Sequence, residues 1–88
     1  DKAGVDANDQ LKYQIVERVR DHLDAFSDHR LNSLDGLRLD FENSSILIRA
    51  SGTEPKIRVI VESEDQGELE RLMGIGKQVV NIAKREVP

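Results

Sequence analysis

The sequence predicts an α+β domain: an antiparallel sheet of three to four strands with two helices packed on one of its faces. Two segments, one near each end of the 88 residues, repeat apolar side chains at helical spacing. Between them, three short segments alternate apolar and polar side chains, as strands with one buried face do. Because the strands follow one another along the chain, short connections favour antiparallel pairing, and the helices then share one face.

The size and composition fit a single small domain. Of the 88 residues, 38% are hydrophobic and 34% charged, which allows one modest core and no second domain. Aromatic residues make up only 3%, so the core must come from Leu, Ile and Val. We expect residues 1–9, which are small and polar, to be a linker from a preceding domain and residues 10–88 to form the folded domain. A first residue that is Asp1 rather than Met suggests a fragment of a longer protein.

The first helix is predicted over residues 10–26. Its apolar positions recur at intervals of four and three and so share one face. They are Leu11, Ile15, Val19, Leu23 and Phe26. Asn8 or Asp9 is expected to cap this helix, because a short polar side chain there can accept from free N–H groups of the first turn. We expect Tyr13 and Phe26 to serve in helix packing rather than as a platform for a sugar ring.

Three strands are predicted between the helices. The first covers residues 37–41, the second begins at residue 46, and the third covers residues 57–61, where β-branched side chains dominate. A fourth strand is left open at this point. It could be missing, formed by residues 28–34, or lost at the start of the fragment.

The second helix is predicted over residues 66–84. Asp65, with Glu68 three residues later, resembles a capping box. The expected buried stripe consists of Leu69, Leu72, Met73, Gly76, Val79, Val80 and Ala83. Gly74 and Gly76 each lower helix stability by about 1 kcal/mol relative to Ala. Close packing of the helix on the sheet is the expected compensation.

The charge and the absence of cysteine exclude several classes of function. The net charge of −4 disfavours nucleic acid and anionic membrane as partners, since both attract an excess of Lys and Arg. Without Cys there is no disulfide, thiol nucleophile or thiolate zinc site. No apolar run approaches the roughly 20 residues that span a bilayer, and we expect a cytoplasmic protein. His22 and His29 lack the spacing of a metal site and are interpreted as surface residues. The acidic residues Glu62, Glu64 and Asp65 are interpreted as a solvated helix start.

The stretch RASGTEPKIR, residues 49–58, has the chemistry of a phosphate site. Gly52 can adopt a positive φ, which would let successive N–H groups point into one anion-binding concavity. Ser51 and Thr53 add hydroxyl donors. Arg49 and Arg58 add guanidinium groups that can bond phosphate oxygens in pairs.

The residues alone leave two other interpretations of this stretch open. A glycine-containing turn between strands, with two exposed arginines beside it, is common and need bind nothing. The chain could also be a stand-alone interaction or RNA-binding module that uses Arg38, Arg49 and Arg58 on a sheet surface. That sheet lacks the aromatic side chains on which bases stack, and the net charge is negative.

Residues 49–58 closely resemble the phosphate-binding loop of the α-D-phosphohexomutase superfamily, which carries R-x-S-G-T-E-P followed by a strand with a second Arg. The likeness extends to the apolar residues 46–48 before the loop and to residues 59–62 after it. It covers about the carboxy-terminal three fifths of the chain. One departure is Ala50, where many relatives have Pro; this change removes stiffness but no hydrogen-bond donor.

The resemblance implies a fold and a role. The family's fourth domain is similar in fold to the TATA-box-binding protein and grips the non-reacting phosphate of the substrate. Arg49, Ser51, Gly52 and Thr53 would bind that phosphate, with Arg58 as the second Arg. The parent enzyme would interconvert hexose 1-phosphates and 6-phosphates, using a phosphoserine and Mg²⁺ held by its other three domains. The continuation I-R-V-x-V-E looks most like phosphoglucosamine mutases and bifunctional phosphomannomutase/phosphoglucomutases. This domain has no cofactor and no catalytic residue of its own, so we expect it to be inactive in isolation.

Overall fold

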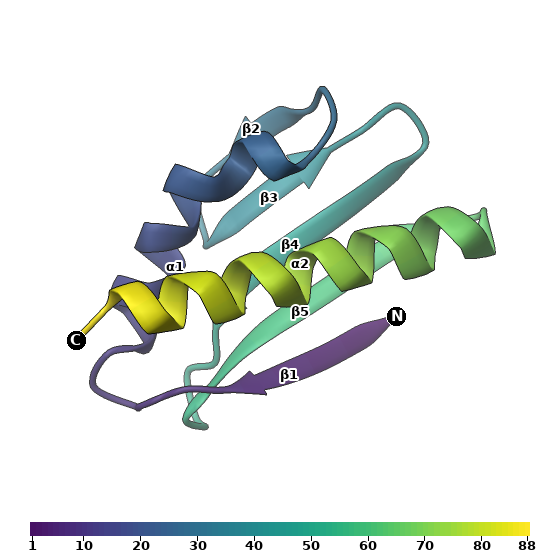
Figure 1. Cartoon of the computed structure of the whole chain (residues 1–88). Coiled ribbons are helices and arrows are strands. Elements are labelled where there is room, and N and C mark those ends of the chain that lie inside the picture. Colours follow the sequence, from purple (N-terminus) through teal and green to yellow (C-terminus); the bar gives the residue numbers. More distant parts are fainter.

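A computed structural model describes all residues, 1–88, and Figure 1 shows its helices and strands. The elements in chain order are β1 (Lys2–Asp6), α1 (Lys12–Val19), the 3₁₀ helix η1 (Arg20–Ala25), β2 (Arg30–Asn32), β3 (Leu37–Asp40), β4 (Ser44–Ala50), β5 (Lys56–Ser63) and α2 (Gln66–Glu86). No helix is both long enough and apolar enough to cross a membrane.

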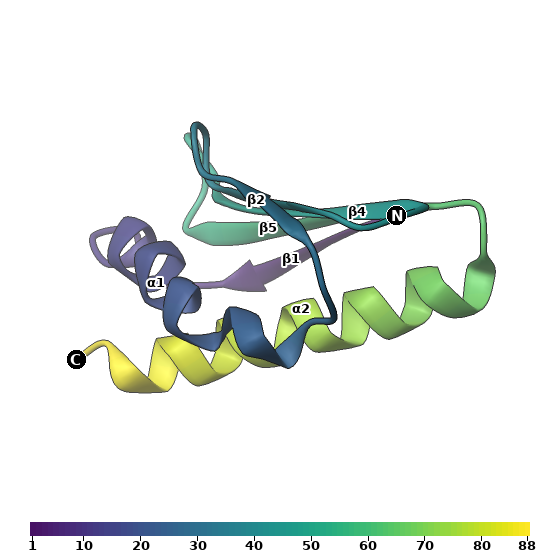
Figure 2. The same cartoon turned by 90° about the horizontal axis from the view of Figure 1, so that it is seen from above.

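The sheet is antiparallel throughout, with the strand order β1-β5-β4-β3-β2. Both α1 and α2 lie on one face of the sheet, and no helix covers the other face (Figure 2). The predicted fold class is therefore confirmed, although the sheet has five strands rather than three to four. The long helix α2 runs across the sheet, and its apolar stripe covers the middle strands (Figure 1).

The expectation that residues 1–9 form a linker is wrong for Lys2–Asp6, which form β1. This segment pairs with β5 from Lys2 opposite Ile60 to Asp6 opposite Lys56. Only Ala3 and Val5 of this strand pack against the core, and both are partly buried. An edge strand with so few apolar side chains gives almost no sequence signal. The open question of a further strand within residues 28–34 is settled by β2, which pairs with β3.

The first helix is shorter than predicted, and the expected cap is absent. α1 ends at Val19, and the chain continues as a 3₁₀ helix to Ala25. Asn8 does not cap α1: its side-chain oxygen accepts the N–H of Gln10 at 2.8 Å, which forms a turn ahead of the helix. Leu11 is the N-cap and makes no side-chain cap bond. The helical periodicity survives this change because a 3₁₀ turn keeps apolar side chains on the same side.

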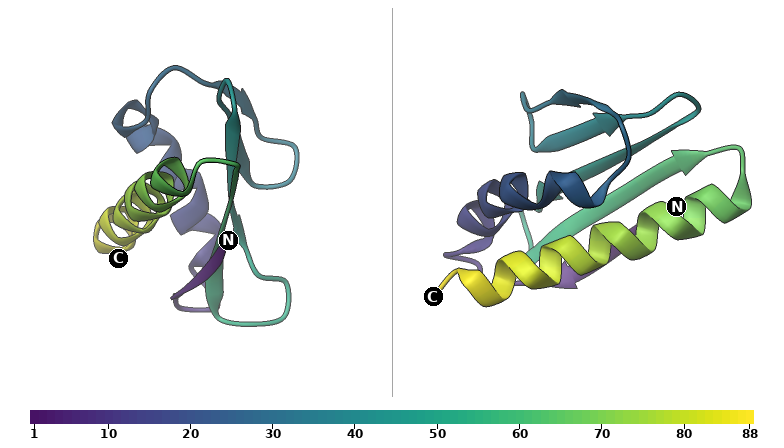
Figure 3. Two further views of the ribbon diagram at one scale, coloured as in Figure 1. Left: turned by 90° about the vertical axis from the view of Figure 1, so that its right-hand side faces the viewer. Right: turned by 45° about the horizontal axis from the view of Figure 1, so that its top comes forward.

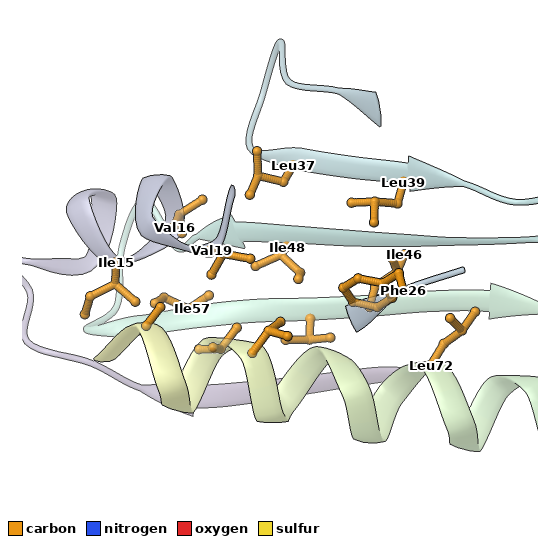
Figure 4. Close-up of a cluster of buried hydrophobic side chains, with 14 of the residues drawn as sticks. Ile15, Val16, Val19, Phe26, Leu37, Leu39, Ile46, Ile48, Ile57 and Leu72 are labelled. Carbon is orange, nitrogen blue, oxygen red and sulfur yellow. The ribbon is translucent and has the colours of Figure 1, made fainter. Parts of the chain in front are cut away.

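The core lies between the helices and the sheet, and Figure 4 shows its central side chains. Aliphatic residues from β3, β4 and β5 meet α1 and α2, and Phe26, which follows η1, belongs to the same cluster. Tyr13 is 63% exposed, so the expectation that it packs in the helix layer is wrong, whereas Phe26 is buried as expected. Gly76 is buried where α2 lies closest to the sheet, because a Cβ there would come within 2.7 Å of Ile46 Cδ1. The predicted close packing is thus confirmed at Gly76 and wrong at Gly74, where a Cβ would meet nothing within 4 Å.

The ends of α2 are fixed by polar contacts. At the amino end, the Asp65 carboxylate accepts the N–H groups of Gly67 at 2.9 Å and Glu68 at 3.5 Å, so the predicted N-cap is confirmed. The return half of the predicted capping box is wrong, because the Glu68 carboxylate pairs with Arg71 and the Asp65 N–H donates to Ser63 Oγ. At the carboxyl end, one oxygen of Glu86 accepts hydrogen bonds from Arg18 Nε at 3.0 Å and His22 Nε2 at 2.6 Å. The hydrogen bond from His22, followed by the one from Arg18, lowers the pKa of the Glu86 carboxyl. This carboxylate joins α1, η1 and α2 on the surface.

Candidate anion-binding site

Two arginines lie side by side on the uncovered face of the sheet. Arg49 on β4 and Arg58 on β5 are direct cross-strand partners. Gly4 of β1 is opposite Arg58 on the other side, and Gly36 lies so close to Arg49 that a Cβ on it would come within 2.7 Å of the Arg49 Cβ. Glycines therefore flank both arginines along this row. No neighbouring side chain from the flanking positions covers them.

Two connections rise from the uncovered face beside this pair. They are the β2–β3 turn, residues 33–36, and the β4–β5 loop, residues 51–55, and both project away from the helices (Figures 2 and 3). The two views agree that these segments stand at the same end of the sheet. The arginine pair lies on the two strands that the β4–β5 loop joins, and Gly36 of the β2–β3 turn lies against Arg49. A separate surface pocket of about 300 Å³ lies between α1 and the β2–β3 turn, and Arg49 is on its wall.

The site carries one uncompensated positive charge. The half-buried Arg58 donates from Nη2 to the carboxylate of Glu54 within the same loop. Arg49 is exposed and forms no ion pair. Two guanidinium groups against one carboxylate leave a local excess of positive charge in a protein of net charge −4. A small anion is the ligand that this arrangement attracts.

Ser51 organises the loop instead of pointing freely into solvent. It is only 6% exposed, and its hydroxyl oxygen accepts the N–H groups of Thr53 at 3.4 Å and Glu54 at 3.1 Å. The Ser51 N–H also donates to the carbonyl of Lys56 at 2.9 Å, which closes the base of the loop. The hydroxyl hydrogen of Ser51 remains available to a ligand, since both bonds use its oxygen as acceptor.

The expected positive φ at Gly52 is wrong. Gly36 is the only residue of the chain with a positive φ, at 87°. Gly52 needs no positive φ, because the Ser51 hydroxyl reverses the chain by accepting two successive N–H groups. An anion cannot use those two N–H groups as they stand. The Gly52 N–H donates no hydrogen bond within the chain, and the space beside its Cα is open.

The structure brings together all five residues predicted for the site. Arg49 is the last but one residue of β4, Ser51, Gly52 and Thr53 lie in the loop, and Arg58 is the third residue of β5. One hairpin therefore supplies two guanidinium groups, two hydroxyl groups and one free backbone N–H. Short sequence separation alone accounts for their proximity.

Sequence reasoning missed two residues that support the hairpin. Gly36 adopts its positive φ directly against Arg49, and the dipeptide Asp35-Gly36 before a strand is a hairpin signal that could have found it. Lys12 is 4% exposed and donates from Nζ to the Glu54 carbonyl at 3.1 Å. No spacing rule links residues 42 positions apart, so the sequence gives no signal for this contact.

No group of three or more His, Cys, Asp or Glu side chains is arranged to hold a metal ion. His22 bonds to Glu86, and His29 Nδ1 lies 2.8 Å from the Ser27 carbonyl while its ring contacts Phe41 edge-on. Both histidines are half-buried rather than freely exposed.

A family model described as phosphoglucomutase/phosphomannomutase, C-terminal domain, matches residues 5–74. The matched range includes the arginine pair, the loop and every strand except the first residues of β1. The chain belongs to this family. The predicted family membership is therefore confirmed.

Named relatives of this phosphoglucomutase/phosphomannomutase C-terminal domain are mutases. A phosphoglucosamine mutase of Methanococcus maripaludis is 39% identical over 72 residues, which are 82% of this chain and 16% of the relative. A probable phosphoglucosamine mutase of Methanocella arvoryzae is 38% identical over 69 residues, 78% of this chain and 16% of the relative. A phosphomannomutase/phosphoglucomutase of Pseudomonas syringae pv. tomato is 34% identical over 71 residues, 81% of this chain and 15% of the relative. The chain thus spans about one sixth of the length of these relatives.

The fold agrees with a solved member of the family. The crystal structure of a phosphoglucomutase/phosphomannomutase family protein from Burkholderia thailandensis superposes with a TM-score of 0.68 at 17% identity. The superposition covers 100% of this chain and 19% of that one. This likeness shows that the chain shares its fold with part of that protein.

Proposed function

We propose that this domain binds the phosphate group of a hexose phosphate through Arg49, Ser51, Gly52, Thr53 and Arg58. The observation that carries the proposal is the cross-strand pairing of Arg49 with Arg58, with a single carboxylate to balance them. Like charges directly opposite each other in a sheet are destabilising. A ligand that brings negative charge explains why two arginines occupy these positions.

The hydrogen-bond donors of the hairpin match a phosphate monoester. A dianion offers three oxygens that accept strong, charge-assisted bonds. Arg49 can present two N–H groups, and Arg58 can do so once it shares or releases Glu54. The hydroxyl groups of Ser51 and Thr53 and the Gly52 N–H complete the set. The open space beside Gly52 lets a phosphate approach the backbone closely.

For the parent protein we propose the activity that the names of the relatives indicate. It would interconvert the 1-phospho and 6-phospho forms of a hexose, and this domain would grip the phosphate that does not react. The phosphoserine, Mg²⁺ and sugar selection would belong to three further domains in the same chain. The chain described here would then show no mutase activity by itself with glucose 1-phosphate or its mannose and glucosamine analogues.

A phosphate titration of the ¹⁵N-labelled chain, followed by NMR, tests the binding proposal. We expect affinity in the millimolar range, about −4 kcal/mol, since one domain alone leaves the sugar in water. The amide signals of Ser51, Gly52 and Thr53 should move most, while those of α1 and α2 stay in place. Sulfate and a short single-stranded RNA serve as comparison ligands. Shifts centred on α2, or tighter binding to RNA than to phosphate, would contradict the proposal.

A further inference from the structure

We propose that Lys12 is a positioning residue that holds the β4–β5 loop in its phosphate-binding shape; this inference rests on the proposed function. Lys12 begins α1, yet its side chain is buried, with 4% of the residue exposed. An ammonium group is strongly hydrated, and its burial costs free energy unless hydrogen bonds replace water. Lys12 Nζ has two such partners: the Asp9 carboxylate at 2.7 Å and the Glu54 carbonyl at 3.1 Å.

The Glu54 carbonyl is the point where the loop turns back. It also accepts the N–H of Lys56 at 2.8 Å. The next carbonyl, that of Pro55, accepts the N–H of Ala7 at 2.9 Å. Two consecutive loop carbonyls are therefore held by Ala7, which follows β1, and by Lys12, which begins α1. This part of the chain is far from the loop in sequence and next to it in space (Figure 1).

The same residue, Glu54, connects this contact to the anion site. Its carboxylate pairs with Arg58, and its N–H donates to the Ser51 hydroxyl. Moving the Glu54 backbone would consequently displace a guanidinium group and the hydroxyl oxygen together. A ligand would then have to order the loop as it binds, and that ordering lowers affinity. Lys12 acts through Glu54 and need not touch the phosphate.

Lys12 adds little net charge to the site, because Asp9 neutralises it at 2.7 Å. Two explanations of weaker phosphate binding by a Lys12 variant can therefore be distinguished. If Lys12 acted as a distant positive charge, its removal would weaken binding in a salt-dependent manner and leave the loop unchanged. If it holds the loop, its removal would change loop dynamics even without ligand.

The test compares Lys12→Met, which keeps the aliphatic stem and removes the donor, with Lys77→Met as the matched control on the exposed side of α2. Inorganic phosphate is titrated by NMR, and amide hydrogen exchange is measured on the free chains. For Lys12→Met we expect roughly tenfold weaker phosphate binding, which equals about 1.4 kcal/mol. We also expect faster exchange at the amides of Ser51, Glu54 and Lys56, with exchange in β3 unchanged. Lys12→Arg, which can still donate to the Glu54 carbonyl, should recover most of the affinity.

Each alternative result is distinguishable. Parent-like binding by Lys12→Met, with Arg49→Ala unable to bind, overturns the role of Lys12 and leaves the phosphate site standing. Weaker binding with unchanged loop exchange also overturns it, in favour of a direct charge effect. If the parent chain binds no phosphate, both the site and this inference fall. Should Lys12→Met prove unfolded, Lys12→Leu, which also has no donor, replaces it in the same comparison, and unchanged loop exchange in that variant contradicts the proposal.

Discussion

Arg49 and Arg58 face each other as direct cross-strand partners on β4 and β5, on the side of the sheet that no helix covers. Like charges directly opposite each other in a sheet are destabilising. The Glu54 carboxylate offsets Arg58 alone. The arrangement therefore lowers the stability of the free domain and attracts an anion.

Replacing Arg49 by Ala should abolish measurable phosphate binding while the domain stays folded. The change removes a charge-assisted donor worth roughly 1.5–3 kcal/mol. The upper value is more than half of the binding free energy at a millimolar Kd, which is about −4 kcal/mol. Because the side chain is exposed and opposes Arg58, the free energy of unfolding should stay the same or rise by a few tenths of a kcal/mol. Phosphate titration and urea denaturation measure the two effects. Arg38→Ala is the control, since Arg38 lies on the same face but pairs with Asp40 at 3.0 Å; equal binding by both variants would contradict the assignment.

Replacing Gly36 by Ala should lower both stability and phosphate affinity. Gly36 has a φ of 87°, and the new Cβ would come within 2.7 Å of the Arg49 Cβ and of the Ile48 carbonyl oxygen. A strained backbone of this kind costs about 1–3 kcal/mol, and relief of the clash requires Arg49 to move. Urea denaturation and phosphate titration are the measurements. A variant as stable as the parent would show that the β2–β3 turn does not press against Arg49.

The two glycines in α2 should respond in opposite ways to Ala. At Gly74 a Cβ meets nothing within 4 Å, so Ala should stabilise the domain by up to about 1 kcal/mol through helix propensity. At Gly76 a Cβ would approach Ile46 Cδ1 at 2.7 Å and Val59 Cγ1 at 2.9 Å. Both neighbours are fully buried, and overpacking should therefore destabilise by about 1–3 kcal/mol. Thermal unfolding of the two variants decides the matter, and a shift of the same sign in both would refute the packing argument.

Acid should weaken the contact that joins the ends of the helices. The pKa of Glu86 is lowered in the folded domain by its hydrogen bonds from His22 and Arg18. The charged carboxylate therefore stabilises the fold above the pKa of an unfolded glutamate, about 4.3, and this stability is lost as the pH falls through the lower folded value. Glu86→Gln should show a smaller loss of unfolding free energy between about pH 5 and 3. Glu42→Gln, an exposed loop residue without an ion pair, should retain the parent's slope.

Affinity for a hexose phosphate should rise between about pH 5 and 7, as the monoester gains its second charge near pH 6. The histidines should not contribute, because His22 is engaged with Glu86 and His29 with Ser27, away from the loop. A titration series with the double variant His22→Gln/His29→Gln measures this. Loss of the pH dependence in that variant would place a histidine in the site.

The sequence by itself determined the parts of this protein that depend on local patterns. Strand alternation in residues 37–61 and the helical stripe of α2 have a fixed period, so the core positions and the fold class could be predicted. The five site residues lie within ten positions of one another, and any hairpin places them together. The cap at Asp65 follows from chemistry within one turn of the helix.

Tertiary structure decided what depends on contacts between distant segments. β1 forms because the edge of β5 supplies its hydrogen bonds, not because its own small, polar residues favour a strand. Gly52 keeps an ordinary backbone because Ser51 turns the loop, and Gly36 becomes part of the site only when the β2–β3 turn meets Arg49. Lys12 reaches Glu54 across 42 positions. Periodicity in the sequence carries no information on contacts between distant residues. Each of these contacts contributes to stability only when the folded sheet has brought both partners together.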